Sequence, residues 1–305
     1  MENIKINIVQ NIKNKSLDLY GKPSSTKRLG QLRLVIISFK MRTSEKNNLK
    51  KDNLKYRSDS VKEIFEEIVE GYNGPQLLLL PGAIPGYTRA HLKEITVLAQ
   101  KHGVGLIVEC ENDETKAKRC YLSYDPRNGW DLKQFVQVFH NNKAKKEKVK
   151  ELLDYLRAGL RTFKNNGAPI SILVCGENNI LQNRQETKNK DVAVRHFEGK
   201  KNLLKNDLSS NIVFNGSHTI MGNWGKLHNR FCKLSSAKRL FIYSTNNTSK
   251  YWGKSAIKIY YNGKSIADSH KIHDEKEFQM SLHKNKKSKF QVLTLDLPKS
   301  FLRTC

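Results

Sequence analysis

A run of apolar and β-branched residues from Pro169 to Val174 leads directly into Cys175 and Gly176. This pattern predicts a buried strand that ends in a tight turn, with a thiol at the turn. A nucleophile on a sharp turn after a strand faces its substrate while its backbone stays rigid. The alternative is a core cysteine, because free cysteine is among the most buried residue types. The segment therefore predicts either a nucleophile or a core thiol.

Predicted strands and helices alternate along the chain. Apolar runs predict strands at residues 32–39, 77–80, 104–108, 119–124, 170–174, 211–214, 240–244, 257–261 and 292–297. Helical periodicity predicts helices at residues 58–72, 88–101, 144–163 and 226–237, the third ending at Asn165–Gly167. Such alternation favours an α/β fold whose sheets are covered by helices. No linker interrupts it, so we expect one domain at 31–298, a basic extension at 1–30 and a tail at 299–305.

The cysteines argue against a disulfide framework and against a structural zinc site. The chain has five cysteines, an odd number, and no two of them form a C-x-x-C pair. We therefore expect no metal and no other cofactor, and Cys175 is left as a thiol that is available for chemistry.

The charge of the chain is strongly positive. Its 55 Lys and Arg residues against 29 Asp and Glu residues give a net charge of +26. Such a field attracts polyanions, so nucleic acid is a possible partner. An AT-rich coding sequence is the alternative source of the lysines, since Asn and Ile are also abundant. The basic residues are scattered and form no dense basic and aromatic stripe.

The apolar segments favour a protein outside the membrane. No run approaches the roughly 18 apolar residues of a membrane span. The first 14 residues lack the apolar core of a signal peptide. We therefore expect a cytoplasmic protein with no membrane partner.

An ordered set of short motifs carries a family resemblance. The set comprises the strand and Pro-Gly turn within 77–87, the turn at 125–129, Cys175-Gly-Glu-Asn, the strand ending at His218, Tyr243-Ser-Thr-Asn246, and the hairpin at 261–263. In this order the chain resembles the nitrilase superfamily, the carbon-nitrogen hydrolases. The resemblance implies a four-layer α-β-β-α sandwich of nitrilase type, commonly a homodimer.

The resemblance also implies a catalytic mechanism for Cys175. Enzymes of that superfamily use a Cys nucleophile, a Glu base and a Lys. Because a thiol with a pKa of about 8.5 is mostly protonated at neutral pH, a carboxylate has to take its proton. The thiolate then attacks an amide or nitrile carbon, the Lys stabilises the developing charge, and water hydrolyses the thioester.

The chain departs from the family pattern at two of these three positions. Gly82 stands where the family has its Glu, and glycine cannot accept a proton. The family's Lys is expected near Asn141, and the nearest lysine is Lys143. Glu177 is a candidate replacement base, or else a carboxylate that positions the loop.

Three further residues are candidates for binding substrate. His218, Tyr243 and Asn246 match motif positions that could line the pocket, and the alternative for each is an ordinary turn, core or surface role. Glu109 and Glu111 near a strand end are interpreted as surface charges.

Three hypotheses about function follow. The first is an active cysteine-dependent carbon-nitrogen hydrolase with a rearranged catalytic triad. The second is a protein of the same fold that has lost catalysis and binds a small molecule or a partner, and Gly82 favours it. The third is a polyanion-binding protein that uses the net charge and makes no use of the pocket.

Overall fold

The computed structural model describes residues 32–41, 49–82, 89–111, 119–135, 137–140, 143–183, 192–197, 208, 210–218, 224–248, 256–273, 276–284 and 290–302. The predicted extension at 1–30 and the last residues of the predicted tail, 303–305, lie outside these ranges. The short 3₁₀ helix Lys299–Leu302 is described, and its Phe301 is buried against the domain core.

The first sheet has eight strands. In spatial order seven of them are β15 (Gln279–Lys284), β16 (Phe290–Leu297), β1 (Leu32–Met41), β2 (Gln76–Leu79), β3 (Gly105–Glu111), β4 (Arg119–Asp125) and β5 (Gly129–Gln134). The eighth, β12 (Asn247–Thr248), pairs with the end of β1. Strands β1, β2 and β3 are parallel, so their carboxyl ends lie at one edge of the sheet.

The second sheet has six strands. Their spatial order is β14 (Lys264–Asp268), β13 (Ile257–Tyr261), β11 (Leu240–Thr245), β10 (Ile212–Ser217), β7 (Ala168–Val174) and β6 (Thr162–Asn165). Strands β7, β10 and β11 are parallel. A separate hairpin pairs β8 (Leu181–Asn183) with β9 (Val192–Val194).

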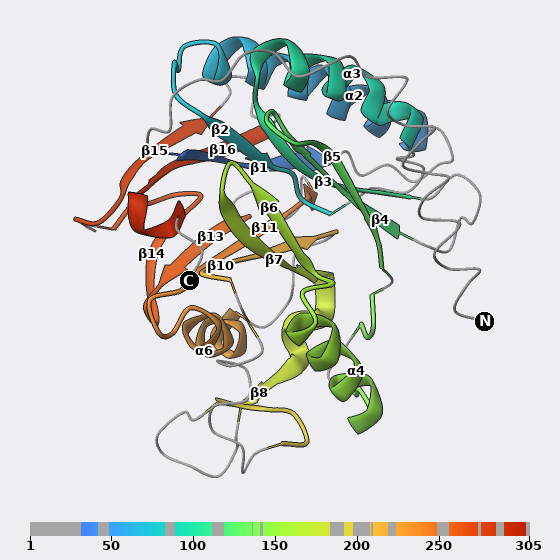
Figure 1. Cartoon of the computed structure of the whole chain (residues 1–305), viewed down its shortest axis with the longest axis vertical. Coiled ribbons are helices and arrows are strands. Elements are labelled where there is room, and N and C mark those ends of the chain that lie inside the picture. Colours follow the sequence, from blue (N-terminus) through green and yellow to red (C-terminus); the bar gives the residue numbers. More distant parts are fainter. Residues whose placement is uncertain are drawn as a thin grey trace.

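Helices cover the outer face of each sheet (Figure 1). Helices α2 (Leu49–Ile64), with the π-helical turn Phe65–Val69, and α3 (Arg89–His102) lie on the first sheet. Helices α4 (Lys146–Arg157) and α6 (Trp224–Leu234) lie on the second sheet, on the opposite side of the molecule. None of the helices in the described ranges has the length and apolar content that crossing a bilayer requires.

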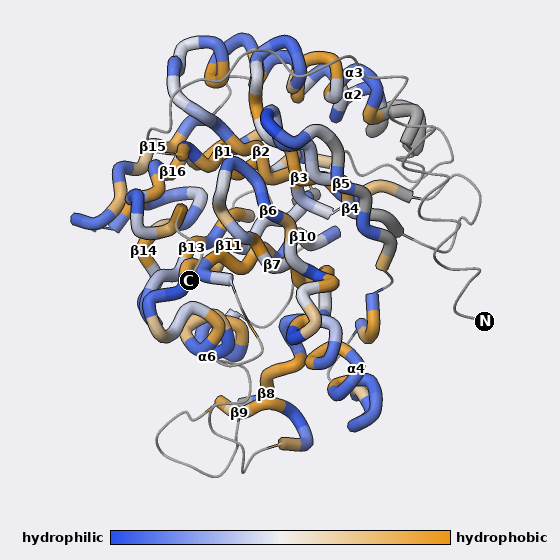
Figure 2. The backbone as a smooth tube through the Cα atoms, viewed as in Figure 1, coloured by the Kyte–Doolittle hydropathy of each residue, from blue (hydrophilic) through white to orange (hydrophobic). Residues whose placement is uncertain are grey.

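Three apolar clusters hold these layers together, and Figure 2 shows apolar segments in several of the strands. Successive strand residues face opposite sides, so Ile107 packs between the two sheets whereas Val108 packs against the helices. Burying each such side chain stabilises the fold by roughly 1.5–3 kcal/mol. The layers are therefore helix, sheet, sheet and helix, and the predicted α-β-β-α sandwich is confirmed.

The predicted helix at 144–163 is wrong in its second half. Helix α4 ends at Arg157, and Gly159 follows with a φ of +68°. Strand β6 then pairs with β7 across Asn166 and Gly167, whose φ values are +50° and +83°. Asn-Gly is the pair most favoured in a two-residue hairpin turn, so this dipeptide joins two strands and does not end a helix.

Candidate active site

Cys175 lies at a strained turn directly after β7. Its φ is +36°, a backbone conformation that residues other than glycine rarely adopt. The chain continues from Cys175 into a 3₁₀ helix that ends at Ile180. A side chain at Gly176 would collide with the carbonyl oxygen of His140, so glycine lets that segment pack against the turn. Strain of this kind persists only where the surroundings impose it, and it concentrates at functional sites.

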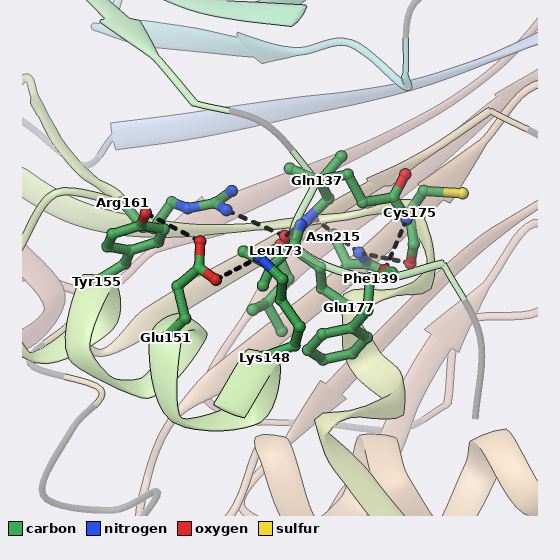
Figure 3. A network of polar contacts seen from close by, with 12 residues as sticks. Gln137, Phe139, Lys148, Glu151, Tyr155, Arg161, Leu173, Cys175, Glu177 and Asn215 are labelled. Atoms are coloured by element: carbon green, nitrogen blue, oxygen red, sulfur yellow. Dashed lines mark hydrogen bonds and ion pairs between the residues drawn. The ribbon is translucent and has the colours of Figure 1, made fainter. Parts of the chain in front are cut away.

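A buried ion pair holds the turn from behind. Glu177 Oε1 accepts from Arg161 Nη2 at 3.0 Å, and both side chains are completely buried. The same carboxylate accepts from the backbone N–H groups of Val138 and Val174, each at 2.8 Å. Glu177 therefore ties the segment before α4 to the end of β7, while the sulfur of Cys175 points away from the Arg161 side of this network (Figure 3).

Buried amides fix the carbonyl group of Cys175. The Nδ2 group of Asn215 donates to the carbonyl oxygens of Leu173 at 2.8 Å and of Cys175 at 3.2 Å. The Nδ2 group of Asn178 donates in turn to Asn215 Oδ1 at 3.1 Å. These bonds leave the thiol as the part of Cys175 that is available for chemistry.

His218 and Glu109 lie on the thiol side of the turn. His218 follows β10, and its Nε2 is 3.1 and 3.0 Å from the two carboxylate oxygens of Glu109 on β3. Glu109 is completely buried, and the hydroxyl of Tyr121 on β4 donates to its Oε2 at 3.2 Å. The site is thus assembled from β7 and β10 of one sheet and β3 of the other.

The environment of Cys175 favours its thiolate. Burial acts to raise the pKa of the thiol, and the Glu109 carboxylate acts weakly in the same direction. A hydrogen bond to the His218 side chain, the charge of that side chain and a hydrogen bond to the His218 backbone all act to lower it. The effects of His218 win, so the pKa of Cys175 lies below its ordinary value. A thiol with a lowered pKa next to an imidazole can act as a nucleophile at neutral pH.

Gly82 lies against this site at the carboxyl end of β2. Its N–H donates to the carbonyl of Ser217 at 3.2 Å. Its carbonyl accepts from Asn246 Nδ2 at 2.6 Å and from Arg57 Nη1 at 3.2 Å. The position at which the resemblance places a Glu therefore contacts the residue next to His218.

The other predicted site residues fall in different places. Lys143 is exposed, and among the described residues the charged groups that act on the Cys175 thiol are His218 and Glu109. Tyr243 is completely buried in the cluster beneath α6, where its ring meets those of Trp224 and Phe231. Of the six candidates, the structure brings His218 to Cys175 on the thiol side, Asn246 to Gly82 and Glu177 to the rear of the turn.

The interpretation of Glu109 as a surface charge is wrong. Glu109 stands two residues after Ile107, so both side chains leave β3 on the face that packs against the second sheet. The alternation of residues along β3 is the sequence signal that indicates burial of Glu109, because it places Glu109 on the same face as Ile107. A carboxylate at such a position needs a partner, and the partner, His218, comes from a distant part of the chain.

No group of three or more His, Cys, Asp or Glu within the described ranges is placed to hold a metal ion. Cys110, Cys175 and Cys232 take part in no disulfide bond among the described residues.

No family model and no curated protein matches the sequence. The fold is similar to solved structures of low sequence identity. They include a double mutant of an amidase from Nesterenkonia sp. AN1 in complex with acrylamide (14% identity, TM-score 0.49, 91% of this chain and 95% of that chain). A carbon-nitrogen hydrolase from Helicobacter pylori G27 has 9% identity, a TM-score of 0.47 and coverage of 90% and 91%.

A third similar structure is a branch 10 member of the nitrilase superfamily from Saccharomyces cerevisiae (9% identity, TM-score 0.46, 92% and 94%). These three are proteins of the kind that the sequence resembles, and the likeness is one of fold alone.

Proposed function

We propose that this protein is a cysteine-dependent hydrolase of carbon-nitrogen bonds in which His218 replaces the family's Glu as the general base. The observation that carries the proposal is the chain of contacts from the Cys175 thiol to His218 and on to the buried Glu109. A nucleophile, a base that contacts it and a third group that orients the base form the general arrangement of a catalytic triad.

The reaction on an amide proceeds in two stages. In the first, His218 takes the thiol proton, a bond forms between Cys175 Sγ and the carbonyl carbon, and the carbon-nitrogen bond breaks. The imidazolium returns its proton to the departing amine, which leaves a thioester. In the second stage His218 takes a proton from water, the hydroxide attacks the thioester, and the acid departs as the thiol is restored.

Glu109 supports both stages from its buried position. With Nε2 of His218 held by the carboxylate, Nδ1 is the ring nitrogen that remains to exchange protons with the thiol. The negative charge also stabilises the imidazolium that forms twice in each cycle. A general base of this kind contributes about 10²–10⁴-fold to the rate.

The runner-up is a protein of this fold that binds a small molecule without hydrolysing it. Gly82 favours this alternative, because the carboxylate that the family uses is missing. Hydrolysis of a nitrile, homodimer formation, nucleic acid as a partner and a cytoplasmic location remain predictions from the sequence.

The test is the pH dependence of Cys175 alkylation by iodoacetamide, followed by mass spectrometry of the peptide that contains it. Thiolate reacts and thiol does not, so the rate rises through the pKa of the thiol. In the wild type we expect the midpoint below the ordinary value of about 8.5. In His218→Ala it should move upward, with a rate at pH 6.5 at least about tenfold lower, since one pKa unit is tenfold in thiolate.

Coincident profiles for the wild type and His218→Ala would refute the proposal, and Cys175→Ala controls for alkylation elsewhere. A panel of small amides then separates hydrolysis from binding. A thioester on Cys175 that hydroxylamine releases supports the hydrolase. A ligand that protects Cys175 from alkylation without forming a thioester supports the binding protein.

A further inference from the structure

We infer that Gly82 is a positioning residue: because it has no side chain, His218 can reach Cys175. The inference rests on the proposed function, since it concerns the same base. It adds that residue 82 decides which segment supplies that base, the one after β2 or the one after β10.

The space beside Gly82 is already filled by His218. A Cβ atom added to Gly82 would lie 2.6 Å from Cδ2 of the imidazole. It would also lie 2.9 Å from the carbonyl carbon of Ser217 and 3.0 Å from the backbone nitrogen of His218. Real Cβ atoms essentially never come within 3.0 Å of another heavy atom, so a side chain at residue 82 requires something to move.

The imidazole ring has little freedom to move away. Its Nε2 is held by both oxygens of Glu109, and Glu109 is completely buried and accepts from Tyr121. The ring can make room for a side chain at residue 82 only by weakening this contact or its contact with Cys175. Either change removes the base from the thiol.

Gly82 is held just as firmly on its own side. Arg57, a completely buried residue of α2, donates from Nη1 to the carbonyl of Gly82 and from Nη2 to that of Pro81 at 3.1 Å. The bond from Asn246 fixes the same carbonyl of Gly82. Since the backbone is clamped from two elements, a side chain at residue 82 would be directed into the ring of His218.

The two possible bases therefore exclude each other. A Glu at residue 82, the residue that the family resemblance leads one to expect, would begin with a Cβ atom in the volume that the imidazole occupies. In this chain the imidazole that follows β10 occupies the volume in which a side chain at residue 82 would begin. Asn246 and Arg57 act through Gly82 and are positioning residues as well.

The experiment is Gly82→Ala, with Gly71→Ala as the matched control. A Cβ atom at Gly71 meets nothing within 4 Å, so this control makes the same chemical change without a collision. In Gly82→Ala we expect the alkylation rate of Cys175 at pH 6.5 to fall at least about tenfold, towards that of His218→Ala. Gly71→Ala should match the wild type.

The double variant Gly82→Ala/His218→Ala completes a double-mutant cycle, which isolates the interaction between a side chain at residue 82 and the ring of His218. Once the ring is absent, the alanine has no imidazole to displace, so the double variant should alkylate like His218→Ala alone. A Gly82→Ala profile equal to the wild type overturns the inference, whereas the proposed function stands as long as His218→Ala differs from the wild type. If His218→Ala itself matches the wild type, the proposed function fails first.

Folding stability decides the question if Gly82→Ala folds poorly. Removing the ring relieves the shortest of the three contacts, so Gly82→Ala should lower the midpoint of unfolding in urea less in the His218→Ala background than in the wild type. Equal losses in the two backgrounds would mean that the backbone alone excludes the side chain, and the inference would be overturned.

Discussion

Two completely buried carboxylates flank the turn at Cys175, and their partners differ. Glu177 lies behind it and accepts hydrogen bonds from Arg161 and from two backbone N–H groups. Glu109 lies on the thiol side and meets His218 and the hydroxyl of Tyr121. The first is bound to a guanidinium, which serves as a fixed cation, whereas the second is bound to an imidazole, a group suited to accepting and returning a proton.

The comparison shows that partners, and not closeness in sequence, decide what a buried carboxylate does. Glu177 is two residues from Cys175, yet its described hydrogen bonds go to the Arg161 side chain and to two backbone N–H groups. Glu109 is far away in sequence, yet it acts on the thiol through one imidazole ring. Substitutions at the two sites should therefore affect different properties, stability for Glu177 and thiol reactivity for Glu109.

The largest effect should come from Arg161→Met, which leaves the buried Glu177 without its cation. Removing one partner of a buried ion pair costs about 3–5 kcal/mol of the free energy of unfolding. Urea unfolding followed by circular dichroism measures the loss. Arg157→Met is the control, because its ion pair with Asp154 is exposed and such pairs contribute about 0–1 kcal/mol. Equal losses of the free energy of unfolding in Arg161→Met and Arg157→Met would contradict the structural role assigned to Glu177.

A smaller effect, on reactivity, should come from Glu109→Gln. The amide keeps the shape of the side chain but no longer stabilises the imidazolium, so the pKa of Cys175 should rise. The direct charge of Glu109 acts the other way, but it is weaker than the effects of His218. We expect an alkylation rate about tenfold lower at pH 6.5, a shift of about 1.4 kcal/mol. Glu94→Gln, at an exposed site, should change nothing, and an unchanged rate in Glu109→Gln would assign Glu109 a purely structural role.

The smallest effect should come from Lys143→Ala. The sequence offers Lys143 as a catalytic candidate, but the residue is exposed and the described charges on the thiol belong to His218 and Glu109. Stability should change by less than about 0.5 kcal/mol, as for most surface substitutions. The alkylation profile should match those of the wild type and of Lys145→Ala. An alkylation profile that shifts to higher pH in Lys143→Ala would mean that Lys143 also stabilises the thiolate of Cys175.

The sequence predicts the architecture better than the site. Buried strands such as β1 and β7 carry runs of apolar residues, and these runs are local signals that need no knowledge of the partner strand. The error at 144–163 arose because Leu160 and Phe163 continue the apolar period of α4. Leu160 is exposed, and Phe163 belongs to β6 and packs between the sheets. The conformation of Gly159 and the Asn166-Gly167 turn override that period.

The site was harder to predict because its contacts join distant segments. The apolar strand before Cys175 marks that residue in the sequence. Gly82 is marked by the resemblance, which implies a Glu at its position. The link between these two residues is His218, and only the stacking of β2 against the end of β10 reveals that its ring fills the space beside Gly82. Alternation along β3 could have placed Glu109 on the inner face, but it could not have named its partner.

The assembly of the site from two sheets has a consequence for the folding of a newly synthesised chain. Strand β3 is synthesised well before β7 and β10, and an isolated second sheet would carry Cys175 and His218 without Glu109. Glu109 joins Cys175 and His218 only after the sheets have stacked, which requires contacts between residues far apart in sequence and is correspondingly slow. Until then the imidazole lies beside the thiol without the carboxylate that holds its Nε2. The rate of Cys175 alkylation during refolding should therefore change when the sheets stack, and it can be used to follow that step.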